Sequence, residues 1–202
     1  MLPVTFRSQQ CSERRIQKRG NATMQESTGK TQRIIVMGVS GCGKTSVGER
    51  LAAVLNGRFI DGDDYHSAAS VAKMAQGEPL DDDDRAGWLS RLADLVGEGR
   101  DNDETLVIGC SALKREYRDR LRRGDAALNF VHLAGTRDVL LQRLLARRDH
   151  FFKGEAMLDS QLATLEAPGA DEAVTVDIDA TLDEVVALSV QGLARGNAER
   201  AS

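Results

Sequence analysis

The segment from residue 38 to residue 45, Gly-Val-Ser-Gly-Cys-Gly-Lys-Thr, carries the clearest chemical signal in this sequence. It matches the pattern G-x-x-x-x-G-K-[S/T], whose glycines let successive backbone N–H groups turn toward phosphate oxygens. The lysine suits the β- and γ-phosphates, and the hydroxyl suits Mg²⁺. We therefore predict that this segment binds ATP, with Lys44 also catalytic and Thr45 also a magnesium ligand. The predicted ATP-binding residues are Gly38, Ser40, Gly41, Cys42, Gly43, Lys44, Thr45 and Ser46.

A second polar segment, Asp61 to His66, follows the short apolar run Phe59-Ile60. Asp61 and Asp63 are two residues apart, so in extended backbone their side chains point the same way. We expect Asp61 to lie on the metal side and Asp63 to act as the general base for an attacking hydroxyl. His66 is expected either to contact the substrate or to make a structural hydrogen bond. A hydrated turn is the alternative for the whole segment, because Asp and Gly are common in turns.

Short apolar runs alternate with amphipathic stretches from Arg33 onward, which predicts βαβ units and a parallel sheet. The expected fold is a three-layer α/β/α domain with a five-stranded parallel sheet. The predicted strands are 34–37, 59–60, 106–108, 130–133 and 174–178. The predicted helices are 44–56, 68–75, 83–98, 114–123, 139–148 and 181 to about 194, the last opened by a capping box of Thr181 and Glu184.

Three polar clusters follow the first three predicted strands, at 38–45, 61–66 and 110–115. Ligands of parallel sheets bind beyond the carboxyl ends of the strands, so we treat these clusters as one site. Trp88 and Cys110 are expected in the core, and Cys42 is interpreted as a small filler of the loop.

Composition excludes several other classes of protein. The 202 residues carry 27 Lys and Arg against 31 Asp and Glu, a net charge of −4, which argues against nucleic acid as a partner. No apolar run approaches the roughly 18 residues of a membrane helix. The three cysteines show neither a zinc spacing nor a disulfide framework, which favours a reduced, cytoplasmic protein.

Both ends of the chain are expected to lie outside the domain, which is predicted to span residues 32–196. Residues 1–31 are rich in Arg and poor in apolar residues, which is typical of a disordered extension or of a start codon placed too early. An organellar transit peptide and a binding arm are the alternatives for this segment. Residues 197–202 are expected to be a disordered tail.

Beyond these motifs, several longer segments resemble one family, the compact phosphate-loop gluconokinases. They are Lys-Met-Ala-Gln-Gly-Glu-Pro-Leu-Asp-Asp-Asp-Asp-Arg at 73–85 with Trp-Leu at 88–89, Cys-Ser-Ala-Leu-Lys-Arg at 110–115 with Tyr-Arg at 117–118, His-Phe-Phe-Lys at 150–153, and Leu-Glu-Ala-Pro-Gly-Ala-Asp-Glu at 165–172. Together with the phosphate loop and 61–66, they extend the resemblance from about Arg33 to Ala194.

The resemblance implies transfer of the γ-phosphate of ATP to D-gluconate, giving 6-phospho-D-gluconate and ADP, with Mg²⁺. It implies a phosphate-loop kinase fold whose mobile lid contains His150-Phe151-Phe152-Lys153, although the two phenylalanines could equally be core. Arg143 would stack on adenine, Arg147 would be a catalytic phosphate ligand, and Pro168 would lie in the adenine loop. The expected substrate ligands are Asp63, His66, Arg85, Ser111, Lys114 and Arg115. Family members are often dimers, so a homodimer is one expectation.

The alternatives for these residues are ordinary solvated surfaces: a helix face for Arg143 and Arg147, and a capped surface helix for Ser111, Lys114 and Arg115. Two other functions remain open at this stage. One is a kinase of the same fold with another acceptor, such as shikimate or a nucleoside. The other is a nucleotide-binding regulatory protein without turnover.

Overall fold

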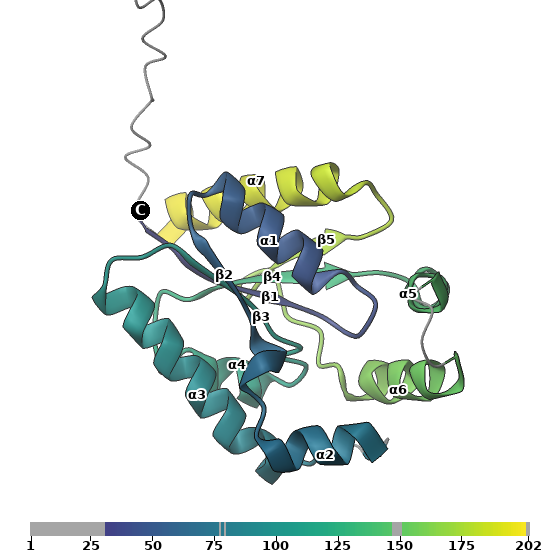
Figure 1. The fold of residues 1–202 in the computed structure, drawn as a ribbon. Helices are drawn as coiled ribbons and strands as arrows, with labels where there is room; N and C mark the ends of the chain where they lie inside the picture. The colour runs from purple at the N-terminus through teal and green to yellow at the C-terminus, as the bar shows by residue number, and fades with distance from the viewer. Residues whose placement is uncertain (1–30, 77, 79, 147–150, 201–202) are drawn as a thin grey trace, which may run out of the picture. The chain divides into compact units, whose positions relative to one another are not determined.

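The strand β1 (Arg33–Met37) lies at the centre of a five-stranded parallel sheet whose strands run in the order β2-β3-β1-β4-β5 (Figure 1). The structure is a computed structural model that describes residues 31–76, 78, 80–146 and 151–200. The other strands are β2 (Arg58–Asp61), β3 (Leu106–Gly109), β4 (Asn129–Ala134) and β5 (Val174–Asp177). All five predicted strands are confirmed, and so is their parallel arrangement.

Alternate residues of β1 face two different helical layers, because successive side chains of a strand point to opposite faces. Ile34 and Val36 pack in one core with α1 (Lys44–Val54) and α7 (Leu182–Arg200). Ile35 and Met37 pack in the other with α3 (Asp82–Asp101) and α4 (Arg115–Leu121). All four side chains are fully buried. Figure 1 shows the two layers on either side of the sheet, so the predicted α/β/α architecture is confirmed.

The register of the sheet places the ends of the central strands side by side. Asp61 of β2 pairs with Gly109 of β3, and Gly109 pairs with Val36 of β1. The chain segments that leave these three strands therefore start at the same edge of the sheet. This is the arrangement that the three polar clusters in the sequence predicted.

The remaining elements are α2 (Ala68–Gln76), α5 (Arg137–Ala146), α6 (Phe151–Thr164) and the short 3₁₀ turn η1 (Gly62–Tyr65). Helix α6 is not among the helices predicted from the sequence, in which this region carries only the lid motif. The signal was present, because Leu158, Leu162 and Leu165 are spaced by four and three residues. Leu158 is fully buried and the other two pack against the same core.

α7 continues to Arg200, four residues beyond the predicted end of the domain at residue 196. Asn197 donates a hydrogen bond from its side chain to Gln32 (3.1 Å), and this contact holds the last turns against the chain before β1. The capping box of Thr181 and Glu184 at the start of α7 is confirmed. The predicted extension falls, up to Lys30, outside the described residues, as do residues 201–202. Thr31–Arg200 belong to one compact unit. None of the described helices is long and apolar enough to cross a membrane.

Candidate active site

The phosphate loop, residues 38–45, connects β1 to α1 and has backbone conformations that require glycine. Gly43 is the N-cap of α1 with a φ of 96°, and Gly41 has a φ of 85°. A Cβ on Gly41 would also lie 2.8 Å from Leu144 and 2.9 Å from the carbonyl oxygen of Leu140. The loop thus packs tightly against α5 (Arg137–Ala146) and leads into α1, whose N-terminal dipole and backbone N–H groups favour an anion.

The side chain of Lys44 lies across the loop. Its Nζ donates hydrogen bonds to the carbonyl oxygens of Gly38 (3.1 Å) and Val39 (3.3 Å). Cys42 is fully buried beneath the same loop, and burial raises the pKa of its thiol. The ammonium group is therefore held by carbonyl groups of its own loop, while Cys42 fills space, as the sequence predicted.

Thr45 and Asp61 meet although they come from different elements. The hydroxyl of Thr45, in the first turn of α1, donates to Oδ2 of Asp61 at the end of β2 (3.0 Å). The other oxygen, Oδ1, accepts the backbone N–H of Asp63 (3.1 Å) and so caps η1. A hydroxyl and a carboxylate side by side are hard oxygen donors, which fit Mg²⁺. The rest of its shell would come from phosphate and water, because Mg²⁺ keeps several waters and binds few protein ligands.

The turn that follows Asp61 rests on a buried aromatic pair. The rings of His66 and Trp88 stack with centroids 4.2 Å apart, and the indole N–H of Trp88 donates to the carbonyl oxygen of Gly62 (2.7 Å). Only 6% of the His66 side chain is exposed, and burial lowers the pKa of its imidazole. Burial therefore favours the neutral form of His66. Its Nε2 lies 3.9 Å from Oδ1 of Asp63, whose side chain is 71% exposed toward solvent.

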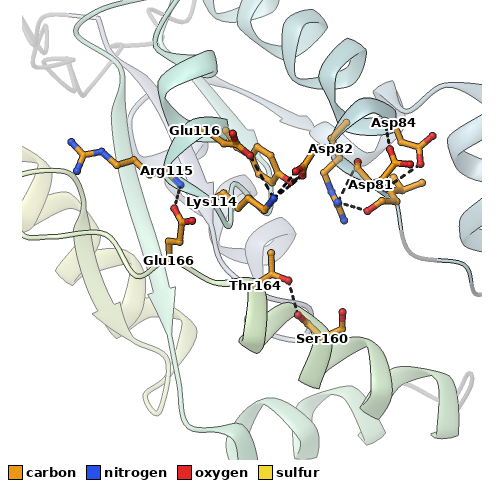
Figure 2. Close-up of polar contacts among 12 residues, drawn as sticks. Asp81, Asp82, Asp84, Lys114, Arg115, Glu116, Ser160, Thr164 and Glu166 are labelled. Atoms are coloured by element: carbon orange, nitrogen blue, oxygen red, sulfur yellow. Dashed lines mark hydrogen bonds and ion pairs between the residues drawn. The ribbon is translucent and has the colours of Figure 1, made fainter.

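A second polar group, here called the Tyr117 cluster, consists of Asp82, Arg85, Lys114 and Tyr117. Asp82 and Lys114 are labelled in Figure 2. Lys114 donates to both carboxylate oxygens of Asp82 (2.8 and 2.7 Å), and the hydroxyl of Tyr117 also donates to Asp82. The ammonium of Lys114 and the guanidinium of Arg85 lie 5.4 and 5.9 Å from the Tyr117 ring centroid. Hydrogen bonds from Lys114 and then Tyr117 lower the pKa of Asp82. The cluster holds two cations and one anion.

Known small-molecule kinases match most of this chain. The family model described as shikimate kinase matches residues 40–192. The thermoresistant gluconokinase of Escherichia coli (strain K12) is 46% identical over 164 residues, 80% of this chain and 93% of that protein. A gluconokinase of Gluconobacter oxydans (strain 621H) is 46% identical over 72% of this chain and 81% of its own. The chain belongs to the gluconokinase family.

A solved gluconokinase structure matches the fold as well. The crystal structure of a gluconokinase from Sinorhizobium meliloti superposes with a TM-score of 0.75 at 43% identity, and covers 82% of this chain and 93% of that one. The phosphate-loop kinase fold predicted from the sequence is thereby confirmed. This chain is an ATP-dependent kinase of the gluconokinase family, so its site can be divided into a nucleotide side and an acceptor side.

On the nucleotide side of this gluconokinase-family site, Arg143 lies beside the phosphate loop. Its Nη1 is 3.9 Å from the place where a Cβ on Gly43 would be, and its Nη2 donates to the carbonyl oxygen of Ile178, just after β5. Ser40 and Ser46 frame the same loop, and Ser46 is exposed in the first turn of α1. Arg147 and His150 of the predicted lid lie outside the described residues.

Two predicted residues are not brought to the phosphate loop. Arg115 donates its backbone N–H to Glu166 (2.6 Å), and Figure 2 shows its side chain directed away from that of Lys114. It lines a separate cavity of about 470 Å³ with Arg118, Arg122 and the loop of residues 166–172. Pro168 belongs to that loop, between two residues that line the cavity. The side chains of Arg115 and Lys114 thus line different surfaces, because neighbouring residues at a helix start diverge, and substrate binding by Arg115 stays a prediction.

Sequence reasoning also missed residues that the fold adds to the site. Gln161 of α6 accepts the backbone N–H of Ser40 in the phosphate loop through Oε1 (2.6 Å). Asp82 and Tyr117 complete the cluster around Lys114, although they are 32 and 3 residues away in the chain. The heptad-like leucine spacing could have revealed α6. No pattern in the sequence marks the contact of Lys114 with Asp82. Trp88 and Cys110 are buried as predicted, and burial raises the pKa of Cys110 to about 12.

Proposed function

We propose that this protein transfers the γ-phosphoryl group of ATP to D-gluconate and releases 6-phospho-D-gluconate and ADP. The observation that carries the proposal is the juxtaposition at one edge of the sheet of the phosphate loop, the Thr45–Asp61 contact and the exposed carboxylate of Asp63. The identity to gluconokinases over most of the chain supports the acceptor. In the reaction, an acceptor hydroxyl oxygen bonds to the γ-phosphorus, the bond from that phosphorus to ADP breaks, and the hydroxyl proton leaves.

The nucleotide side supplies most of the charge stabilisation. Phosphoryl transfer depends on positioning and on cations around the transferring group rather than on covalent chemistry. Lys44 would leave the carbonyl groups of Gly38 and Val39 and pair with the β- and γ-phosphates. Thr45 and Asp61 would hold Mg²⁺ directly or through water. A bound Mg²⁺ supplies positive charge to the phosphate oxygens. Arg143 borders the loop on the side where the nucleoside would lie.

Asp63 is the residue best placed to accept the proton of the hydroxyl. The backbone N–H of Asp63 donates to Oδ1 of Asp61, the metal-side residue, so the two residues lie side by side. The hydrogen bond uses the backbone of Asp63 and leaves its carboxylate available for the hydroxyl. The ring of His66 lies against this carboxylate and stacks on the ring of Trp88. His66 is thus proposed to act on the substrate mainly through Asp63, since its own ring is buried.

The acceptor side must bind an anionic polyol. A carboxylate of the acceptor needs a cation, and Lys114 and Arg85 of the Tyr117 cluster are two cations around one aromatic ring. Ser111 lies next to the phosphate loop, because its carbonyl oxygen accepts the N–H of Gly38 (3.3 Å), and its hydroxyl would bind an acceptor hydroxyl. Arg115 is left out of this binding set because its side chain lines the other cavity.

The proposal is tested by ADP release from Mg-ATP across a panel of D-gluconate, other sugar acids, shikimate and nucleosides. We expect release that depends on gluconate, with formation of 6-phosphogluconate verified by mass spectrometry. The match to the shikimate kinase model makes shikimate the second candidate acceptor. Release with shikimate alone would establish that alternative. ATP binding with no release for any acceptor would favour a protein without turnover.

Two further properties are proposals that rest on the sequence. A homodimer follows from the family resemblance, and light scattering coupled to size-exclusion chromatography tests it. A cytoplasmic location follows from the cysteine pattern and is tested by cell fractionation.

A further inference from the structure

Arg118 has the largest fully buried side chain in the described part of the protein, although it carries a charge. Its guanidinium forms a two-pronged pair with Glu172, from Nε to Oε1 (2.8 Å) and from Nη2 to Oε2 (3.0 Å). The Glu172 side chain is itself only 12% exposed, and hydrogen bonds from Arg118 and Arg122 lower the pKa of its carboxyl. Removing the carboxylate partner of a buried arginine strongly destabilises the fold, because it leaves an uncompensated buried charge.

The remaining guanidinium nitrogen of Arg118 reaches two other segments. Nη1 donates to the carbonyl oxygens of Ala112 (3.2 Å) and Leu113 (3.1 Å), and also to that of Glu166 (3.0 Å). One side chain therefore joins the segment after β3 to both ends of the loop 166–172. We call this set, Ala112, Leu113, Arg118, Glu166 and Glu172, the Arg118 junction.

The segment held by Arg118 has an unusual backbone and carries acceptor residues. Ala112 has a φ of +44°, a conformation that residues other than glycine adopt only when the surroundings impose it. Ser111 precedes it and Lys114 follows it. The direction of both side chains therefore depends on a turn that Arg118 stabilises through the carbonyl groups of Ala112 and Leu113.

The same junction lies at the end of α6, which contacts the phosphate loop. Glu166, two residues after α6, donates its N–H to Leu113 (2.9 Å). Gln161 of α6 accepts the N–H of Ser40, and the N–H of Gly38 reaches back to Ser111. Direct contacts thus run from the phosphate loop through α6 to the Arg118 junction, and from there through Ser111 to the phosphate loop again.

We infer that Arg118 and Glu172 are positioning residues that set the acceptor segment 111–114 against the phosphate loop. The inference rests on the proposed function for the identity of the acceptor. Neither residue touches the reacting atoms. Their pair fixes where Ser111 and Lys114 stand relative to the γ-phosphoryl group, and a displacement of about 1 Å in such a site costs on the order of 10²-fold in rate.

The chain offers a matched control for this inference. Arg33 and Asp125 form a second buried pair, with Nη2 and Oδ2 2.6 Å apart and side chains only 10% and 7% exposed. Arg33 begins β1, so this pair lies at the opposite end of the strands from the phosphate loop. Its loss should lower stability without moving any acceptor residue.

The experiment compares Glu172→Gln with Asp125→Asn in steady-state kinetics for gluconate and for ATP, after thermal melts show that both are folded at the assay temperature. We expect both variants to melt earlier. Only Glu172→Gln should lower kcat/KM for the acceptor, by about tenfold to a hundredfold, with the KM for ATP within about twofold of wild type. Arg118→Lys, which keeps the charge and loses the fork, should give the same pattern.

The outcomes separate positioning from stability alone. Unchanged acceptor kinetics in folded Glu172→Gln or Arg118→Lys would overturn the inference, as would an equal loss in Asp125→Asn. If Glu172→Gln does not fold, Arg118→Lys decides the question. Failure of the wild-type protein with gluconate would overturn the proposed function instead, and the variants would then be compared with the acceptor that the wild type does use.

Discussion

Residues 38–45 supply the phosphate loop from one uninterrupted segment. The Tyr117 cluster instead takes Asp82 and Arg85 from α3, Tyr117 from α4 and Lys114 from the residue before α4. The loop binds through its own backbone, whose glycine conformations are encoded locally. The cluster depends on side chains that meet only after the sheet has formed. Mutations in the loop should therefore slow phosphoryl transfer itself. Mutations around the cluster should weaken binding of the acceptor and leave binding of ATP unchanged.

Asp63 is the proposed general base and lies beside the metal-side residue Asp61, so its replacement should have the largest effect. In Asp63→Asn the carboxylate that accepts the hydroxyl proton is absent, so kcat should fall by about 10² to 10⁴-fold. The matched control is Asp64→Asn, which removes the neighbouring exposed carboxylate of η1. Initial rates of ADP release measure both. Near-normal kcat in Asp63→Asn would remove it as the base.

Lys44 tests the nucleotide side alone. Lys44→Ala should lower kcat by about 10² to 10³-fold, because a cation no longer meets the charge that develops on the phosphoryl oxygens. The fold should stay intact, since the ammonium bonds only to carbonyl groups of its own loop. Arg50→Ala, farther along α1 in an exposed pair with Asp183, is the control. Circular dichroism shows whether each variant is folded, and initial rates of ADP release measure kcat. Full turnover in Lys44→Ala would contradict the proposed role of Lys44.

Lys114 tests the acceptor side alone. Lys114→Gln should raise the KM for gluconate by about tenfold to a hundredfold, the cost of losing a hydrogen bond to a charged group, and leave the KM for ATP unchanged. Arg100→Gln, near the other end of α3, serves as control. An equal rise in the KM for ATP would show that the phosphate loop and the Tyr117 cluster do not act separately.

The smallest expected effect concerns pH and the turn beneath Asp63. Burial lowers the pKa of His66 from its ordinary value of 6.5, so between the two pKa values the folded protein binds fewer protons than the unfolded chain. The free energy of unfolding should therefore fall as the pH drops below about 6.5. His66→Phe, which keeps a ring against Trp88, should make this dependence shallower by at most about one proton. Urea unfolding at pH 7.5 and 5.5 measures it, and an unchanged slope contradicts the assignment.

Local patterns predicted most of the fold because they follow from local physical causes. Ile34 to Met37 formed the central strand since a continuous apolar run can be buried on both faces. Thr181 and Glu184 began α7 as expected, because a capping box needs only four residues. The end of α7 was placed too early, since the contact of Asn197 with Gln32 joins residues from the two ends of the domain.

The nucleotide side of the candidate site was as predictable from the sequence as the fold. The acceptor side was less predictable. Thr45 and Asp61 lie together as their separate motifs indicated. Arg115 and Lys114 are adjacent in the sequence, and their side chains nevertheless serve different surfaces, because Glu166 binds the backbone of Arg115 and Asp82 binds Lys114. Glu166 and Asp82 are 51 and 32 residues away from their partners, so no local pattern could reveal these contacts.

The sequence by itself determined the phosphate loop, the parallel sheet and the edge at which the polar clusters gather, because glycine conformation, apolar periodicity and strand direction are properties of short segments. Only the tertiary structure decided that Asp82 and Tyr117 surround Lys114, that Gln161 reaches the phosphate loop, and that Arg118 joins the acceptor segment to the loop after α6. Those contacts depend on the distance between side chains from separate elements, which packing sets and local composition does not.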